Sequence, residues 1–258
     1  GRSAGPPRAS RGRRRSGPGG PAGAAAGPNF TTHDFSGAPV ANTWYVEAIA
    51  NARHGSDLRP DPGTQDIGAE FNSQLDAGLG GACLGGKTWF YGIGASVPSN
   101  QVDLFTTVLH EIGHGLGLLT LYDPFDGTKF LGLDDSFLRL LRDETTNKSW
   151  SAMTNAERLA SQVNTSNLTW TGAAANAAVG AFSAGTKNGR FRMYAPNPVE
   201  PGSSVGHFDT ALSPNELMEP GLEVDTVDYL AYRAMGDVGW IVRMIFKDGF
   251  DSGNENFW

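Results

Sequence analysis

The chain has 258 residues, which is long enough for one large domain or two small ones, each with a hydrophobic core. Its 35 glycines and 15 prolines favour a loop-rich fold over a helical bundle or a coiled coil. No run approaches the roughly 20 apolar residues that cross a bilayer, so we expect no transmembrane segment. The single cysteine, Cys83, excludes an intrachain disulfide and a zinc site made of cysteines alone.

Charge is distributed unevenly along the chain. The first 20 residues contain six arginines and no acidic residue. The rest of the chain therefore has 14 basic and 27 acidic residues, and its formal charge of −13 would repel nucleic acid. We expect no nucleic-acid partner. Residues 1–28 are rich in glycine and proline and have no aromatic residue and no amphipathic period, which predicts a disordered basic arm.

Four elements are predicted in the first half of the chain. The spacing of apolar residues suits a helix over residues 41–53. Apolar and polar residues alternate over residues 67–71, which is typical of a strand, and a second strand is predicted over residues 88–91 after a glycine-rich turn. Residues 102–118 form the clearest predicted helix, because their apolar side chains recur at three- and four-residue steps.

The second half of the chain is predicted to be irregular, with short elements joined by loops. The signals are a capping box, an alanine-rich segment and a helix-ending glycine. The predicted elements are a short helix over 135–142, a helix opened by Thr154 and Glu157, an alanine-rich piece over 173–181, a last helix over 226–235 that stops at Gly236, and a surface tail over 241–258.

The predicted helix over 102–118 contains the sequence His110-Glu-Ile-Gly-His114. Histidines four residues apart lie about 40° apart around a helix and one turn along it, so both imidazoles can reach one tetrahedral metal ion. Glu111 lies roughly 100° from His110, which places its carboxylate beside the metal as a base acting on water. Gly113 costs about 1 kcal/mol relative to alanine inside a helix. Such a local conflict indicates a functional constraint.

A zinc ion that performs hydrolysis needs three protein ligands and one open position for water. In one large group of zinc peptidases a further histidine follows six residues after the second, but here that position is Thr120, which is not a zinc ligand. The third ligand must therefore come from elsewhere in the chain. The candidates are His33, His54, His207, Asp123, Asp134, Asp135, Glu144 and Glu157.

Three sequence motifs together resemble the metzincin metallopeptidases. They are the run from His110 to Gly117, the downstream sequence Gly-Ser-Ser-Val-Gly-His207-Phe-Asp, and the sequence Asn-Glu-Leu-Met218-Glu-Pro. The chain is most similar to the leishmanolysin type, in which an insertion separates the helix from the third histidine. The resemblance covers about residues 29–240. The leishmanolysin proteins are rich in disulfides and this chain is not, so the resemblance extends to the catalytic core alone.

The resemblance implies a zinc-dependent endopeptidase that hydrolyses peptide bonds in a protein or peptide substrate. It also implies secretion, although the residues around position 20 lack the continuous apolar region of a signal peptide. The site residues that it implies are the zinc ligands His110, His114 and His207, the general base Glu111, and Met218 in a methionine turn beneath the metal.

The fold implied by the resemblance is α+β and zincin-like. An N-terminal subdomain at residues 29–119 would contain a mixed sheet and the active-site helix. A C-terminal subdomain at residues 120–240, including the insertion, would be irregular and mostly helical and loop. The arm at residues 1–28 and the tail at residues 241–258 would flank this catalytic domain.

Two alternatives remain open from the sequence. A gluzincin-like peptidase would keep the two helix histidines and use Glu144 or Glu157 as the third ligand. A non-catalytic secreted domain would use the same zinc ion structurally, and such a site is closed by a fourth protein ligand. These alternatives differ in which side chain the fold brings to the two helix histidines.

Overall fold

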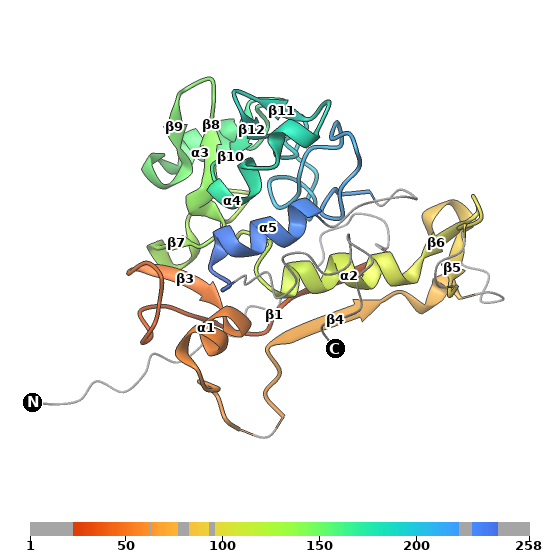
Figure 1. The fold of residues 1–258 in the computed structure, drawn as a ribbon, viewed down its shortest axis with the longest axis horizontal. Helices are drawn as coiled ribbons and strands as arrows, with labels where there is room; N and C mark the ends of the chain where they lie inside the picture. The colour runs from red at the N-terminus through yellow and green to blue at the C-terminus, as the bar shows by residue number, and fades with distance from the viewer. Residues whose placement is uncertain (1–22, 62, 77–82, 93–95, 222–228, 242–258) are drawn as a thin grey trace, which may run out of the picture.

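The structure is a computed structural model. It describes residues 23–61, 63–76, 83–92, 96–221 and 229–241. Figure 1 shows two regions: an upstream layer, residues 23–118, built along one long helix, and a downstream lobe, residues 119–240, made of small sheets and short helices. This mixture confirms the predicted α+β class. Within the described ranges, no helix is both long enough and apolar enough to cross a membrane.

The upstream layer is built from paired strands and two helices. The elements are β1 (Ala24–Pro28), β2 (Thr31–Thr32), β3 (Thr43–Val46), α1 (Glu47–His54), β4 (Ile67–Phe71), β5 (Thr88–Phe90), β6 (Gln101–Asp103) and α2 (Leu104–Gly115). Strand β1 pairs antiparallel with β4 and β2 pairs antiparallel with β3, whereas β5 pairs parallel with β6. In Figure 1, α2 lies alongside β1 and β4, and both elements contact it. The two strands predicted at residues 67–71 and 88–91 are confirmed.

Strand β1 overturns part of the predicted disordered arm. The prediction for residues 1–28 is wrong for residues 24–28, which pair with β4 from Ala24 opposite Phe71 to Pro28 opposite Ile67. A strand is held in a sheet by main-chain hydrogen bonds, which almost any residue type can make. The small alanine side chains of β1 also let it lie close to α2. Residues 1–22 of the predicted arm lie outside the described residues.

The segment predicted as one helix over residues 41–53 is a strand followed by a helix. All four residues of β3 are buried, and the strand lies between β2 and β7 (Asp134–Asp135). Threonine, tryptophan, tyrosine and valine suit a strand that is packed on both sides. Helix α1 begins only at Glu47 and ends at His54, where Gly55 adopts a left-handed conformation with φ of 85°.

Helix α2 is shorter than the predicted span of residues 102–118, because the first of these residues belong to β6. The side chain of Asp103 accepts hydrogen bonds from the N–H groups of Phe105 and Thr106 and so caps the helix. The helix ends at Gly115, and Gly117 then adopts a positive φ of 110°. The amphipathic helix with its histidines is therefore confirmed, with its ends two or three residues inside the predicted ones.

The downstream lobe contains more strand than the mostly helical and loop structure that was predicted. Its further elements are β8 (Leu141–Asp143), β9 (Lys148–Ser149), α3 (Asn155–Ser161), β10 (Leu168–Trp170), α4 (Ala173–Asn176), β11 (Thr186–Lys187), β12 (Arg190–Phe191) and α5 (Tyr229–Val238). Strands β10, β8 and β9 form one antiparallel sheet, and β11 pairs with β12. The capping box predicted from Thr154 and Glu157 is confirmed at the start of α3. The alanine-rich piece is α-helical only in α4.

Residues 135–142 do not form the predicted helix. The segment contains the end of β7, a single 3-10 turn over residues 138–140 and the start of β8. The buried carboxylate of Asp135 accepts hydrogen bonds from two N–H groups of its own turn and from Thr120 and Leu121. Aspartate that binds nearby backbone N–H groups favours a turn over a helix. Burial raises the pKa of Asp135 to about 6, although the hydrogen bonds from these four donors act to lower it.

Helix α5 extends beyond the predicted stop at Gly236. It continues to Val238, whose side chain is buried, and ends at Gly239, which has a φ of 128°. Burial of Val238 offsets the cost of about 1 kcal/mol that a glycine imposes inside a helix. The predicted first turn at residues 226–228 and the tail at residues 242–258 lie outside the described residues.

The main hydrophobic core fills the downstream lobe and extends to β3 and α1. A second, small cluster joins Leu75 to Trp89 near the far end of α2. The largest fully buried side chains are Trp150, Trp170, Phe137, Phe191, Ile49, Leu75, Leu118, Leu138, Leu141, Leu168, Met193 and Met218. The lobe therefore forms a packed body against which the C-terminal end of α2 rests.

Candidate metal centre

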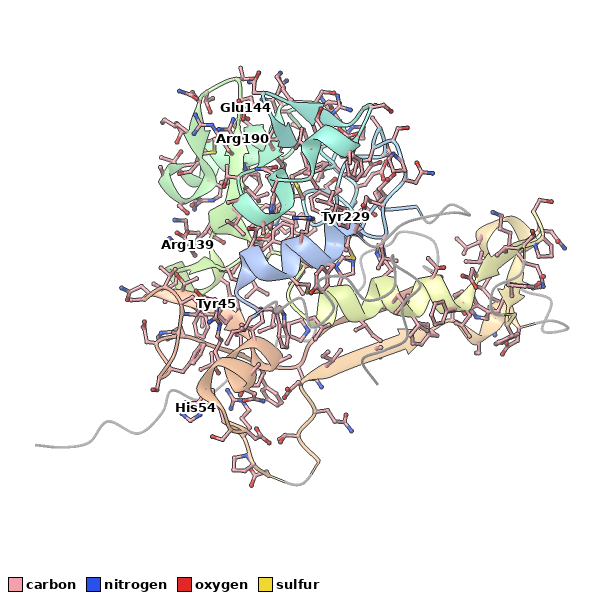
Figure 2. The ribbon with its side chains drawn as sticks, viewed as in Figure 1. Tyr45, His54, Arg139, Glu144, Arg190 and Tyr229 are labelled. Atoms are coloured by element: carbon pink, nitrogen blue, oxygen red, sulfur yellow. The ribbon has the colours of Figure 1, made fainter. Side chains whose placement is uncertain are left out.

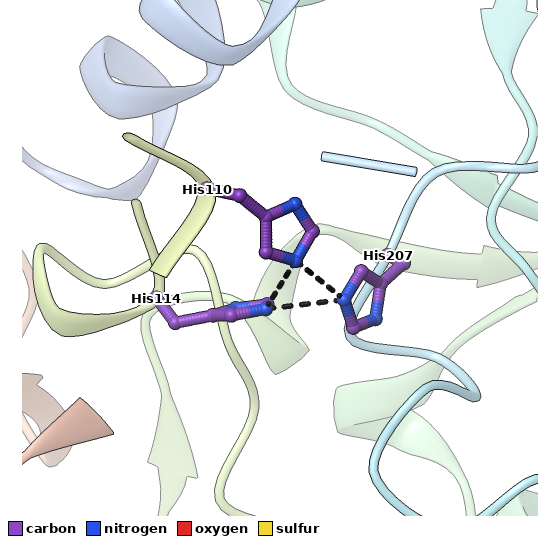
Figure 3. Close-up of side chains that lie close together, drawn as sticks. All are labelled: His110, His114 and His207. Carbon is purple, nitrogen blue, oxygen red and sulfur yellow. Dashed lines mark hydrogen bonds between the residues drawn. The ribbon is translucent and has the colours of Figure 1, made fainter. Parts of the chain in front are cut away.

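Three imidazoles meet between the upstream layer and the downstream lobe. Helix α2 presents His110 and His114 on one face, and His207 approaches them from the lobe (Figure 3). The three Nε2 atoms are each 3.1 Å from the other two. A tetrahedral ion bound by nitrogen at about 2.0–2.1 Å holds its ligand atoms about 3.3 Å apart. The spacing of the three nitrogens therefore fits one tetrahedral metal ion.

The Nδ1 atom of each imidazole forms a hydrogen bond with a backbone carbonyl oxygen. His110 Nδ1 lies 2.6 Å from the carbonyl oxygen of Leu217, His114 Nδ1 lies 2.7 Å from that of Leu118, and His207 Nδ1 lies 2.7 Å from that of Ser203. A carbonyl oxygen only accepts, so each Nδ1 must donate its hydrogen. In the neutral imidazole this leaves a lone pair on Nε2.

Three lone pairs at this spacing repel one another unless a cation lies among them. Burial lowers the pKa of His110, and burial together with the two neighbouring imidazoles lowers the pKa of His207 well below its ordinary value. Both rings are therefore neutral at neutral pH, which is the form that binds metal. The donor set fits a divalent ion of the zinc type.

His207 is held by backbone pairing rather than by a helix or a long strand. Its carbonyl oxygen accepts the N–H of Tyr194 at 2.9 Å, and the next residue, Phe208, donates its N–H to the carbonyl oxygen of Met218 at 2.9 Å. Phe208 also forms an isolated antiparallel β-bridge with Met193, and its ring is buried. These contacts fix the loop from both sides, so the imidazole is positioned without a regular element of its own.

Met218 lies against α2 at Gly113. The side chain is 1% exposed, and a Cβ atom built on Gly113 would lie only 2.7 Å from its sulfur. A Cβ atom on Gly115 would in turn lie 2.3 Å from the side chain of Ile67. Only glycine fits at both positions without displacing a neighbour. The glycines that weaken this helix locally are therefore explained by close packing against Met218 and β4.

Glu111 follows the first histidine and is buried with it, with 7% of its surface exposed. Burial raises the pKa of its carboxyl group to about 7, and a hydrogen bond from the backbone N–H of Ala26 acts in the opposite direction. A carboxylate with a pKa near neutrality can both take up and release a proton. The proton affinity of Glu111, which directly follows His110 in the chain, would suit proton transfer near neutral pH.

The other two histidines lie outside this centre. His33 hydrogen-bonds to Asp34 at 2.7 Å and packs edge-on against Trp44. His54 lies at the end of α1, away from α2 in Figure 2, and its Nδ1 is 3.0 Å from the Ser56 hydroxyl. Both side chains have local partners on the upstream layer, so His207 is the histidine that the fold brings to His110 and His114.

The acidic candidates also lie elsewhere in the lobe. Glu144 accepts hydrogen bonds from Thr169, Asn188 and Arg190, and Figure 2 places the Glu144–Arg190 pair at the far end of the lobe. The remaining candidates have structural partners near them in sequence or space. Asp123 accepts the N–H of Phe125, Asp134 pairs with Lys129, Asp135 holds its own turn, and Glu157 closes the capping box and pairs with Lys148.

No sequence pattern predicts the backbone groups of the site. These are the carbonyl oxygens of Ser203, Leu217 and Leu118 and the N–H of Ala26. Every residue type carries the same main-chain groups, so no composition or spacing points to them. Only Leu118 had a local signal, because it follows His114 by one helical turn at the end of the predicted helix.

Comparison with known proteins identifies no relative. No protein-family model matches the chain, and neither the curated proteins nor the solved structures contain a match. The three histidines and Glu111 are therefore the features of the molecule that bear on its function.

Proposed function

We propose that the protein is a zinc-dependent endopeptidase of the metzincin type that acts outside the cell. The observation that carries this proposal is the convergence of His110, His114 and His207 through their Nε2 atoms, with the buried Glu111 beside them. Three neutral imidazoles leave a bound zinc ion with its full double charge, which suits hydrolysis better than thiolate ligands do. The resemblance of the sequence motifs to metzincins supports the same reaction.

A catalytic role is favoured over a structural one by the number of ligands. Within the described ranges, the cluster of metal-binding side chains consists of three histidines. Structural zinc sites are closed by four protein ligands, whereas catalytic sites keep one position for water or substrate. The gluzincin-like alternative is not favoured, because Glu144 and Glu157 have other partners in the lobe.

Each residue of the centre has a defined part in the proposed reaction. The three histidines bind the metal, and the carbonyl oxygens behind them hold the rings in orientation. A zinc ion, when bound, lowers the pKa of water towards about 7 and polarises the carbonyl of the scissile bond. The Glu111 carboxylate takes a proton from the attacking water and transfers it to the nitrogen of the departing amine. Met218 packs against Gly113 of the helix, and the metzincin resemblance implies that it lies in a methionine turn beneath the metal.

The test is digestion of an unfolded protein substrate by the purified chain, with and without a metal chelator. We expect cleavage to stop with the chelator and to return when zinc is added. Glu111→Gln should bind one zinc ion per chain and lose cleavage by about 100-fold or more, because it removes the proton acceptor but no ligand. Glu70→Gln on the exposed face of β4 is the matched control and should cleave normally. Cleavage that survives the chelator, or that survives Glu111→Gln, contradicts the proposal.

A further inference from the structure

One buried turn of the downstream lobe, residues 216–219, is hydrogen-bonded to both segments that carry the candidate metal ligands. The carbonyl oxygen of Leu217 lies 2.6 Å from Nδ1 of His110 on α2. The carbonyl oxygen of the next residue, Met218, accepts the N–H of Phe208 at 2.9 Å, and Phe208 directly follows the histidine of the lobe. The conformation of this turn therefore bears on the histidines of both regions.

The two glutamates at the ends of the 216–219 turn are linked in both directions. The N–H of Glu219 donates to the carbonyl oxygen of Glu216 at 3.2 Å, which is the main-chain bond of a β-turn. The N–H of Glu216 donates in return to the carboxylate of Glu219 at 2.7 Å. The carbonyl groups of Leu217 and Met218 belong to the peptide units between these two bonds. Closing the turn therefore fixes the directions in which both carbonyl groups point.

The carboxylate of Glu216 attaches the same turn to helix α5. Its Oε1 atom accepts the N–H of Leu230 in this helix at 3.0 Å, and the bond is buried. Leu230, Ala234 and Val238 of α5 are themselves buried in the core of the lobe. The turn is therefore held against the packed body of the lobe, from which it reaches α2.

Neither turn propensity nor packing accounts for glutamate at these two positions. Glu216 is 0% exposed and Glu219 is 4% exposed. Burying a carboxylate is costly unless donors satisfy it, and the residues that favour turns are glycine, proline, asparagine, aspartate and serine. A hydrogen bond from an N–H to a carboxylate is charge-assisted and about twice as strong as one between neutral groups. The backbone N–H groups that the two carboxylates accept therefore explain these residues.

We propose that Glu219 is a positioning residue of the metal centre, whose carboxylate holds the 216–219 turn in the conformation that directs the Leu217 carbonyl oxygen at His110. This inference rests on the proposed function and deepens it, because it states how the lobe orients a ligand of the helix. Removing the outer partner of a metal ligand typically weakens metal binding by about 10- to 100-fold. Glu219 acts through that partner, so we expect the lower end of this range.

The first experiment follows the imidazole N–H signals of the zinc-free, 15N-labelled full chain by NMR. Glu219→Met keeps much of the side-chain volume and removes the carboxylate that accepts the N–H of Glu216. We expect the Nδ1–H of His110 to exchange with solvent at least about 10-fold faster in this variant. The Nδ1–H of His114 binds the carbonyl oxygen of Leu118, outside the turn, and should exchange at an unchanged rate. An unchanged rate at His110 overturns the inference.

The second experiment measures the zinc affinity of the full chain by competition with a chromophoric chelator. We expect Glu219→Met to bind zinc about 10-fold more weakly, whereas Glu219→Gln, whose amide oxygen still accepts the N–H, should stay within about 3-fold of the unmodified chain. Asp143→Leu is the matched control. Asp143 is 1% exposed and also accepts N–H groups of its own turn, those of Thr145 and Thr146. This control should lower Tm at least as much as Glu219→Met and leave the zinc affinity unchanged.

Three results overturn the positioning role. An unchanged zinc affinity in Glu219→Met would mean that the site does not depend on this carboxylate. An equal loss of affinity in Asp143→Leu would mean that zinc binding only follows stability. An equal loss in Glu219→Gln would mean that the charge acts and the accepted hydrogen bond does not.

Glu219→Asp replaces Glu219→Met if the methionine variant does not fold. It keeps the charge but leaves the carboxylate one methylene short of the Glu216 N–H. Weaker zinc binding in Glu219→Asp than in Glu219→Gln supports the inference, and equal binding in the two variants overturns it.

Failure of the proposed function gives a different result from failure of this inference. A chain that binds zinc with the expected order of affinities but cleaves no protein substrate contradicts the endopeptidase proposal and supports the role of Glu219. A chain that binds no zinc contradicts both.

Discussion

Among the described residues, nine of the twelve largest fully buried side chains lie in the downstream lobe and three lie in the upstream layer. The layer in turn leaves Phe105, Leu109 and Ile112 of α2 exposed by 54%, 37% and 39%. Two of the three histidines of the candidate metal centre nevertheless come from this thinly packed layer. Elements with few buried contacts open more easily, so the comparison predicts a stable lobe and a more labile layer joined at the metal centre.

The largest expected effect is the loss of a tryptophan from the core of the lobe. Trp170 is fully buried, packs edge-on against Phe137 and Phe208, and donates its indole N–H to Asp237. Trp170→Ala should lower the free energy of unfolding by about 3–5 kcal/mol. Trp89→Ala, in the small cluster of the layer, should cost less in global unfolding and raise amide exchange mainly in β5 and β6. Equal losses in denaturant unfolding would show that the two regions unfold as one unit.

Metal removal should loosen the junction between the two regions. A zinc ion at a free concentration 100 times its Kd stabilises the folded chain by about 2.7 kcal/mol. We therefore expect a chelator to lower Tm and to raise amide exchange around α2 more than in the β8–β10 sheet. His207→Ala removes the ligand that the lobe contributes, so its Tm should no longer respond to zinc, whereas His54→Ala should respond like the unmodified chain. A zinc response that persists in His207→Ala argues against a ligand from the lobe.

A methyl group at position 113 tests how closely the regions approach. The Cβ of Gly113→Ala would lie 2.7 Å from the Met218 sulfur, so the buried Met218 side chain or α2 must shift. Overpacking of this kind typically costs about 1–3 kcal/mol, and it should cost less in a Met218→Ala background, so the losses of the two single variants should not add in the double variant. Gly180→Ala, which meets no atom within 4 Å, should change stability by less than about 0.5 kcal/mol. Thermal unfolding of Gly113→Ala, of Met218→Ala, of the double variant and of Gly180→Ala measures these losses of stability.

The smallest expected effect concerns a surface charge of the lobe. A hydrogen bond from Lys148, with others from Thr154, lowers the pKa of Glu157 to about 2 from its ordinary 4.5. A carboxyl group whose pKa is lowered by folding stabilises the folded state above pH 4.5, and this contribution disappears as the pH falls towards 2. Glu157→Gln should therefore flatten the dependence of Tm on pH over this window. An unchanged dependence would mean that the pair does not contribute in solution.

The parts of the fold that follow local rules are the parts that the sequence predicts. The three- and four-residue periodicity of α2, its His110-Glu-Ile-Gly-His114 motif and the capping box of α3 all depend on residues close in the chain. Residues 135–142 depart from the predicted helix because Asp135 is held by Thr120 and Leu121, which no local pattern reveals.

The candidate site also has a part that local sequence patterns predict and a part that they do not. The two helix histidines and Glu111 follow from helical spacing, whereas the place of His207 was implied only by family resemblance, since a loop has no period from which to infer its approach. Strand β1 was missed because an alanine-rich segment has no strand propensity of its own and is ordered by pairing with β4. The backbone amide of Ala26 was not predicted either, because every non-proline residue carries the same main-chain N–H.

The carbonyl oxygens behind the three imidazoles also bear on which metal the candidate centre would bind. They orient the rings before any ion arrives, in an arrangement that suits a tetrahedral ion, so the geometry would favour zinc over copper(II), which prefers tetragonal sites. For a site of nitrogen donors the intrinsic affinity follows the Irving–Williams order, in which copper binds more tightly than zinc. Geometry and metal supply together would therefore decide the occupant, and a chain that folds where free copper is scarce and zinc is plentiful would take zinc.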